Sequence, residues 1–154
     1  MTTRASIEQV AGILVREGLR FQTHEDGDSY RLLFGEDAVF IHFESVGDHV
    51  RIALSSPALQ DIDEDGAGAA IALNELNRLN VEHRFVKWVF DEGTLIAGVD
   101  LLGDDLQASE LRNAVYTLAG TVSQVAEELE ERVGGSRYGE LLEEELDELE
   151  VEDE

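Results

Sequence analysis

The feature that most restricts the fold is a change in the spacing of apolar residues along the chain. Three segments repeat apolar residues every three or four positions, as amphipathic helices do, at residues 6–18, 67–80 and 108–133. Two further segments, 20–54 and 82–102, alternate apolar with polar residues, as half-buried strands do. Blocks of neighbouring strands between helices predict an α+β protein with an antiparallel sheet flanked by helices.

Turn residues divide the first alternating block into three or four strands. Gly27, Gly35 and Gly47 lie in short polar clusters, and the apolar alternation resumes after each cluster. Pro57, the only proline, predicts the end of the last of these strands. The expected strands are 20–22, 30–34, 39–44 and 49–54. They form a meander with one buried face.

The second alternating block is a strand pair, 82–91 and 94–102, with apolar residues on both faces. Phe85 and Val89 fall on one side and Trp88 on the other. Strands that are covered on two sides have this pattern. We therefore expect one side to pack on the helices and the other on a partner, a ligand or a second copy of the chain.

Capping residues predict where the helices begin and where the domain ends. Ser6 with Gln9 three positions later is a capping box for the first helix, and Gly134 with Gly135 ends the third. A chain of 154 residues is the length of one domain, which we place at residues 1–135. The acidic segment 136–154 spaces its leucines helically inside a run of like charges, which predicts a disordered tail or a marginal amphipathic helix.

The net charge of -24 arises from 35 acids against 11 bases, of which only Lys87 is a lysine. Such a surface repels phosphate backbones and anionic headgroups, which excludes nucleic-acid and membrane partners unless the protein imitates nucleic acid. An acid-rich, lysine-poor surface suits a high-salt cytoplasm, because salt screens its self-repulsion. The alternative is a GC-rich genome, whose codons also favour arginine. The lack of cysteine, of an apolar leader and of a membrane-length apolar run predicts a cytoplasmic protein.

One segment, Asp61–Gly66, has the carboxylate spacing of the first half of an EF-hand calcium loop. Position twelve of that loop is Ala72 instead of glutamate, so we interpret it as a solvated loop whose Asp65 caps the following helix, with weak cation binding as the alternative. The histidines lack ligand spacing, and neither a nucleophile elbow nor a distinct carboxylate pair is present. We predict no enzymatic activity, no metal site and no cofactor.

The helix segment Leu73–Arg78 (LNELNR), followed by the strand Arg84–Trp88 (RFVKW), resembles the YbjN-like family, which shares the fold of type III secretion chaperones. The resemblance covers residues 5–133. It implies the order α-β(3-4)-α-β-β-α, dimerisation, and binding of an extended or helical protein segment, without catalytic residues. Asn74 and Asn77 match the family pattern, and we expect them to tie their helix to the following loop through side-chain to backbone bonds.

A bound peptide would lie on the less-covered face of the sheet, or add a strand to a free edge. The candidate binding residues on that face are Phe40, His42, Arg84 and Trp88, with burial in the core as the alternative for Trp88. We predict a non-enzymatic protein- or peptide-binding module, a chaperone or adaptor acting as a homodimer in a high-salt cytoplasm. The alternative is an acidic inhibitor or immunity-type protein that imitates nucleic acid.

Overall fold

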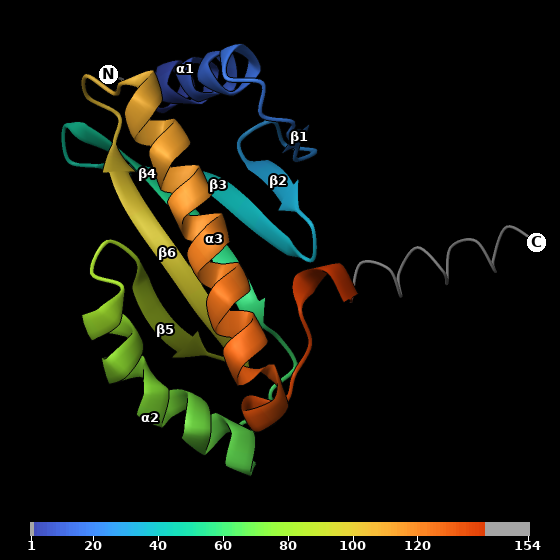
Figure 1. The fold of residues 1–154 in the computed structure, drawn as a ribbon. Helices are drawn as coiled ribbons and strands as arrows, with labels where there is room; N and C mark the ends of the chain where they lie inside the picture. Colours follow the sequence, from blue (N-terminus) through green and yellow to red (C-terminus); the bar gives the residue numbers. More distant parts are fainter. Residues whose placement is uncertain (1, 141–154) are drawn as a thin grey trace, which may run out of the picture.

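The computed structural model describes residues 2–140 and has the predicted α+β order of one helix, four strands, one helix, two strands and one helix (Figure 1). The helices are α1 (Thr3–Arg16), α2 (Ala67–Glu82) and α3 (Ala108–Val133). The strands are β1 (Gln22–Thr23), β2 (Tyr30–Phe34), β3 (Asp37–Val46), β4 (His49–Leu59), β5 (Lys87–Asp91) and β6 (Thr94–Leu102). The predicted fold class is confirmed.

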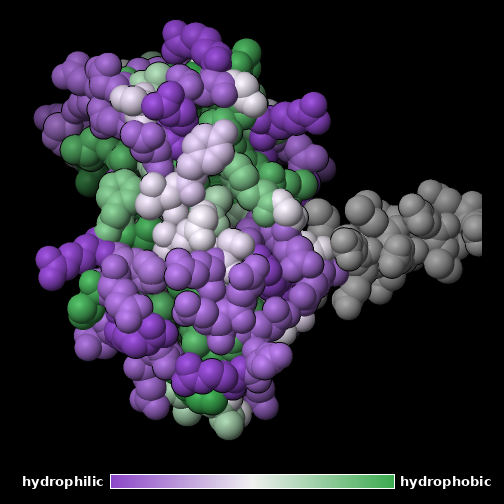
Figure 2. Space-filling model, in the orientation of Figure 1, coloured by the Kyte–Doolittle hydropathy of each residue, from purple (hydrophilic) through white to green (hydrophobic). Residues whose placement is uncertain are grey.

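The strands form one six-stranded antiparallel sheet in the order β1-β2-β3-β4-β6-β5. The two strand blocks join where β6 pairs with β4, so the second block extends the sheet formed by the first. Figure 1 shows α3 running across one face of the sheet, with α1 at one end of this helix and α2 beside β5. Seen from the side of α3, the surface of the molecule is mostly hydrophilic (Figure 2).

The core lies between α3 and the sheet. Every member of the predicted α3 stripe is buried: Leu111, Val115, Leu118, Val122, Val125, Leu129 and Val133. On the sheet, register neighbours Ile41, Leu54 and Val99 on β3, β4 and β6 belong to the same core. Full burial of a side chain of this size contributes about 1.5–3 kcal/mol, so α3 fixes which face of the sheet is covered.

The first two helices begin differently from the prediction. The N-cap of α1 is Thr2, whose hydroxyl accepts a hydrogen bond from the Ala5 amide at 3.1 Å, and Ser6 is buried inside the helix. The N-cap of α2 is Gly66, so the capping role that we predict for Asp65 is wrong. In both cases several residues next to the helix start can cap, and tertiary packing selects among them.

Strand β4 does not end at Pro57, contrary to the prediction, and continues to Leu59. The pairing of β4 with β3 ends at Ser55, and beyond that point β4 pairs with β6 alone. The register shifts between Pro57 and Leu59. A proline lacks an amide hydrogen, and an edge-like stretch with a bulge tolerates this loss.

Residues 136–140, which we predict to belong to the tail, pack against the domain. Ser136 exchanges two backbone hydrogen bonds with Gln60, both of 2.8 Å. The Arg137 side chain is 9% exposed and donates to Asp37 at 2.7 Å, and the Gly139 amide donates to the Glu36 carbonyl at 2.6 Å. We call residues 136–140 the strap. The rest of the predicted tail, 141–154, lies outside the described residues.

None of the helices within residues 2–140 combines the length and the apolar character needed to cross a membrane.

Candidate functional site

The face of the sheet opposite α3 has no helix over it in residues 2–140. Its side chains alternate along each strand with the buried ones and are half-buried or exposed. We call this surface the open face. It includes Arg31, Leu33, Phe40, His42, Arg51, Ser55, Pro57, Lys87, Val89 and Ile96.

Two adjoining hollows lie on the open face, with volumes of about 550 Å³ and about 510 Å³. Both are lined by His24, Ser29 and Phe40, so they meet at the Phe40 ring. The second also includes Pro57 and Ile96. Each hollow is the size of a small-ligand site, and together they form a trough that can receive successive side chains of one chain segment.

The open face carries balanced charges, although the molecule as a whole is strongly acidic. Arg51 forms ion pairs with Glu44 at 2.9 Å and with Asp100 at 3.3 Å, and Lys87 lies 3.6 Å from Asp100. These pairs are partly exposed and each contributes little to stability. The pairs place cationic groups beside apolar ones on this face. The open face therefore does not repel a peptide, whereas the rest of the surface repels anions.

The strap places Tyr138 against Phe40 on the open face. The Tyr138 ring meets the Phe40 ring edge-on, with 5.6 Å between centroids and 83° between planes. Arg31 Nη1 donates to the Tyr138 hydroxyl at 2.6 Å. The His42 ring stacks on the Phe40 ring, with 6.4 Å between their centroids. The sequence held one unused signal for this contact, because Arg137 is the last base in the chain and precedes a run of acids.

The structure brings two of the four candidate binding residues together and separates the other two. Phe40 and His42 are neighbours on the open face, as expected. The prediction that Trp88 shares this face is wrong, because Trp88 is 2% exposed and points into the core on the opposite face. Arg84 lies in the turn between α2 and β5 and is exposed, outside the sheet. The binding role of Phe40 and His42 stays a prediction.

The side chain of Asn80 forms hydrogen bonds with backbone groups on the outer edge of β5. Its amide nitrogen donates to the Trp88 carbonyl at 3.1 Å, and its amide oxygen accepts from the Trp88 amide at 2.7 Å. We expected Asn74 and Asn77 to tie α2 to the chain that follows, but both are exposed, and Asn80 makes these bonds. The Asn80 side chain thus already binds the backbone amide and carbonyl of Trp88, to which an added strand would otherwise bind.

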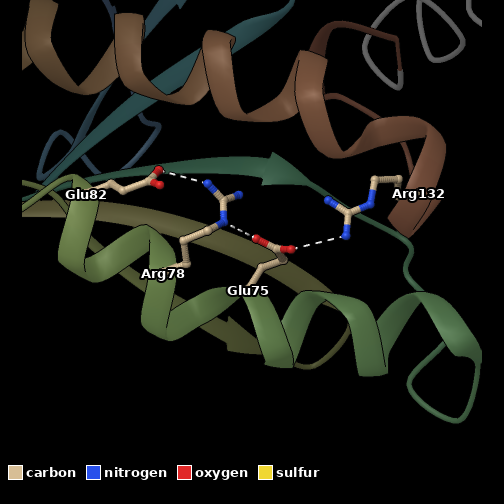
Figure 3. Close-up of polar contacts among 4 residues, drawn as sticks. All are labelled: Glu75, Arg78, Glu82 and Arg132. Atoms are coloured by element: carbon tan, nitrogen blue, oxygen red, sulfur yellow. Dashed lines mark hydrogen bonds and ion pairs between the residues drawn. The ribbon is translucent and has the colours of Figure 1, made fainter.

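A charged network holds α2 against α3 (Figure 3). Glu75 accepts from Arg78 Nε at 2.5 Å and from Arg132 Nη2 at 3.2 Å, and Arg78 Nη1 donates to Glu82 at 2.8 Å. The hydrogen bond from Arg78, joined by that from Arg132, lowers the pKa of Glu75 below its ordinary value. The network joins α2 to α3 at one point, Arg132, while the buried residues Ala69, Ala72 and Leu79 pack α2 into the core.

Possible metal ligands gather outside the Asp61–Gly66 loop, at a place where no cation site was expected. In residues 2–140, the ligand atoms of His24, Asp26 and Asp28 lie within 4.8 Å of one another on the exposed β1–β2 turn. The carboxylates of the Asp61–Gly66 loop do not form such a group in this part of the chain. Within that loop, Asp63 Oδ1 accepts from the Asp65 amide at 3.1 Å.

Comparison with known proteins places the chain in a family. Residues 5–141 match the model of TY-Chap1, described as "T3SS (YopN, CesT) and YbjN peptide-binding chaperone 1". The chain belongs to this family. TY-Chap1 is a family of peptide-binding chaperones and not of enzymes, in agreement with the predicted resemblance and with the prediction of a non-enzymatic protein. Membership also favours the chaperone prediction over a protein that imitates nucleic acid.

Two solved structures with TM-scores above 0.5 support the fold. A chain in the crystal structure of the ExsC–ExsE complex has 20% identity and a TM-score of 0.61, covering 82% of this chain and 95% of that one. A chain in the HopA1–SchA chaperone–effector complex has 11% identity and a TM-score of 0.57, covering 82% and 98%. An uncharacterized protein from Methanothermobacter thermautotrophicus has 17% identity, a TM-score of 0.49, and coverage of 84% and 99%. No curated protein matches the sequence.

Proposed function

We propose that this TY-Chap1 protein binds an extended segment of a client protein across the open face of its sheet and acts as a chaperone or adaptor in the cytoplasm. The observation that carries the proposal is the trough formed by two hollows that meet at Phe40, on a sheet face without a helix over it in residues 2–140. Membership of a peptide-binding family supports it. One similar structure, HopA1–SchA, is a chaperone–effector complex.

The open face is a better client site than the edges of the sheet. At one edge, β1 has only residues Gln22 and Thr23 to offer to an added strand. At the other edge, the amide of Asn80 already binds the backbone of Trp88 in β5. A client that added a strand at β5 would first have to break these two hydrogen bonds, whereas the trough is accessible without this cost.

The charge of the protein indicates the chemistry of the client. A net charge of -24 attracts basic segments and accelerates their encounter, and the effect weakens as salt rises. The trough is lined by apolar groups such as Phe40, Pro57 and Ile96. We therefore infer a client segment in which apolar side chains alternate with basic ones.

We infer a homodimer that forms through the outer face of α2. Leu73 and Val81 project from one face of this helix and are 54% and 58% exposed, and Phe85 in the following turn is 56% exposed. Apolar side chains grouped in this way mark interaction surfaces. Replacement Leu73→Asp should yield a folded monomer in sedimentation or native mass measurements. A wild-type protein that is monomeric at micromolar concentration would refute the dimer.

We also infer that the acidity adapts the protein to a high-salt cytoplasm. The support is the excess of 35 acids over 11 bases, with Lys87 as the only lysine. Carboxylates at this density repel one another in dilute buffer, and molar salt reduces the Debye length to about 3 Å. The inference predicts a melting temperature that rises from dilute buffer to molar salt.

The test of client binding uses two labelled peptides of about 10 residues, which are long enough when extended to cross six strands spaced by about 4.8 Å. One peptide alternates leucine with lysine, and the other alternates leucine with glutamate. We expect fluorescence anisotropy to show binding of the first only. The variant Ile96→Asn, which changes the floor of the trough without changing charge, should bind about tenfold more weakly.

Val15→Asn is the matched control, because Val15 is 68% exposed on α1, away from the open face. It should bind the lysine peptide like the wild type. Equal binding by both variants would place the peptide elsewhere and contradict the proposed site. Failure of the wild type and of all variants to bind the lysine peptide would contradict the proposed client chemistry.

A further inference from the structure

The Tyr138 ring packs against two residues that line the trough, Phe40 and Arg31. The two hollows of the open face meet at Phe40, and Tyr138 packs edge-on against this ring. Its hydroxyl takes the hydrogen bond of Arg31 Nη1, a donor that projects from the same face. Tyr138 thus uses one aromatic contact and one polar contact of the trough, and both are contacts that a peptide could use.

The backbone on both sides of Tyr138 is fixed. Before it, the buried Arg137 side chain donates to Asp37 at 2.7 Å and lies 3.2 Å from Glu36. After it, the Gly139 amide donates to the Glu36 carbonyl at 2.6 Å, and a Cβ at position 139 would lie 2.5 Å from Glu36 Cα. These contacts hold the strap on the turn between β2 and β3. The part that can move at low cost is therefore the Tyr138 side chain.

The partners of Tyr138 are kept in place when its ring leaves. Arg31 Nε donates to Gln22 Oε1 at 2.8 Å, and Arg31 Nη2 contacts the same oxygen. Phe40 stacks on His42. Arg31 Nη1 would then be available to a carbonyl oxygen of a peptide, and the Phe40 ring to an apolar side chain.

We propose that Tyr138 is an internal competitor for the client: its ring occupies Phe40 and Arg31 where the two hollows of the trough meet, and a bound client segment displaces the ring while the strap stays anchored. This proposal rests on the proposed function and adds a regulatory element to the same site. It predicts that the wild type binds more weakly than a protein without the ring, because only the fraction with the ring displaced is competent to bind.

The first experiment measures affinity for the labelled leucine–lysine peptide. Tyr138→Ala should bind about two- to twelvefold more tightly than the wild type, the factor that corresponds to the loss of one edge-on aromatic pair. Tyr116→Ala is the matched control. Tyr116 is an exposed tyrosine on α3 that also makes an edge-on contact, with Phe34, but lies on the side of the helices. It should leave affinity unchanged.

The second experiment observes the ring directly. The chain has three tyrosines, so protein labelled with 3-fluorotyrosine gives three ¹⁹F resonances, which Tyr138→Phe and Tyr116→Phe assign. Addition of the leucine–lysine peptide should move the Tyr138 resonance toward the value of an exposed tyrosine and leave that of Tyr116, on the side of the helices, in place. This readout reports displacement independently of affinity.

The outcomes separate this proposal from the proposed function. Peptide binding with an unmoved Tyr138 resonance, or equal or weaker binding by Tyr138→Ala, would leave the client site standing and overturn the competitor role. Binding by Tyr138→Ala where the wild type shows none would support the competitor in its strongest form. If neither protein binds the peptide, the proposed client chemistry is contradicted and the competitor role falls with it.

Discussion

At the scale of single residues, one asparagine side chain forms hydrogen bonds at the edge of the sheet where a further strand would form them. Asn80 makes with Trp88 the pair of hydrogen bonds that a neighbouring strand would make, and the side chain of Trp88 is buried beneath it. The network around Glu75 joins the same helix, α2, to α3. Asn80 thus links the packing of α2 to the order of the sheet edge.

Asn80→Ala should lower the free energy of unfolding by about 1–3 kcal/mol, because the amide and carbonyl of Trp88 lose their partners. Urea unfolding followed by the fluorescence of Trp88, the only tryptophan, measures this change. Asn77→Ala is the control, since Asn77 is exposed on the same helix, and it should change the free energy by less than about 0.5 kcal/mol. Equal effects of the two substitutions would contradict the role given to Asn80.

Glu130 introduces a dependence of stability on pH. Its pKa is raised by burial and then by its hydrogen bond and repulsion with Glu140, which outweigh the opposite effect of Arg137. Since the folded-state pKa lies above the ordinary value of 4.5, ionised Glu130 destabilises the fold at neutral pH. This cost disappears as pH falls through the raised pKa. Glu130→Gln should therefore raise the melting temperature at pH 7 and flatten its rise on mild acidification.

Glu131→Gln removes the same charge from an exposed position next to Glu130 and is the matched control. If it raised the melting temperature as much as Glu130→Gln, the effect would come from net charge alone. Glu75 acts in the opposite direction at lower pH. Its pKa lies below 4.5, so its stabilising contribution is lost as pH falls through that lower value.

At the scale of secondary-structure elements, α2 and α3 approach each other closely at a glycine. A Cβ at Gly68 would lie 1.9 Å from the carbonyl oxygen of Val133, a contact that backbone movement alone can relieve. Gly68→Ala should destabilise the protein by about 1–3 kcal/mol in thermal or urea unfolding.

Gly120→Ala provides the comparison, because Gly120 lies within α3 and a Cβ there has nothing within 4 Å. It should stabilise the protein by about 0.5–1 kcal/mol through helix propensity. A neutral or stabilising Gly68→Ala would show that the close approach of the helices is not required.

The elements were predictable to different degrees, for physical reasons. The bounds of α3 agree with the prediction, since a long apolar stripe and the Gly134–Gly135 pair are both local signals. The face of Trp88 was not predictable, because β5 has apolar residues on both sides and only the position of α3 decides which is covered. The strap was missed because its partners, Asp37 and Gln60, are distant in sequence.

The same distinction holds for the candidate site. Phe40 and His42 were placed together by period-two alternation, which is a local property of β3. The trough, and the contact of Tyr138 with Phe40 beside it, arise from contacts between segments that no spacing pattern relates. Residue types indicated the chemistry of the site. The shape of the trough could be determined only from the structure.

At the scale of the whole molecule, the net charge of -24 makes stability depend on salt. The melting temperature should rise steadily from about 0.1 M to above 1 M KCl, as the Debye length falls from about 10 Å to about 3 Å. Sucrose is the control, because it stabilises by exclusion without screening charge. A melting temperature that levels off near about 0.15 M KCl would contradict adaptation to a high-salt cytoplasm.

The strap also sets an order of events during synthesis. Arg137 and Asp37 are separated by 100 positions, so their bond must wait until 100 further residues have been added after Asp37. The strands of the open face precede the strap in the chain, and domains can begin to fold from the N-terminal side during translation. A newly made molecule would therefore present an uncovered Phe40 before Tyr138 arrives. The interval before residue 138 has been made is the time at which a client made nearby would meet the least competition.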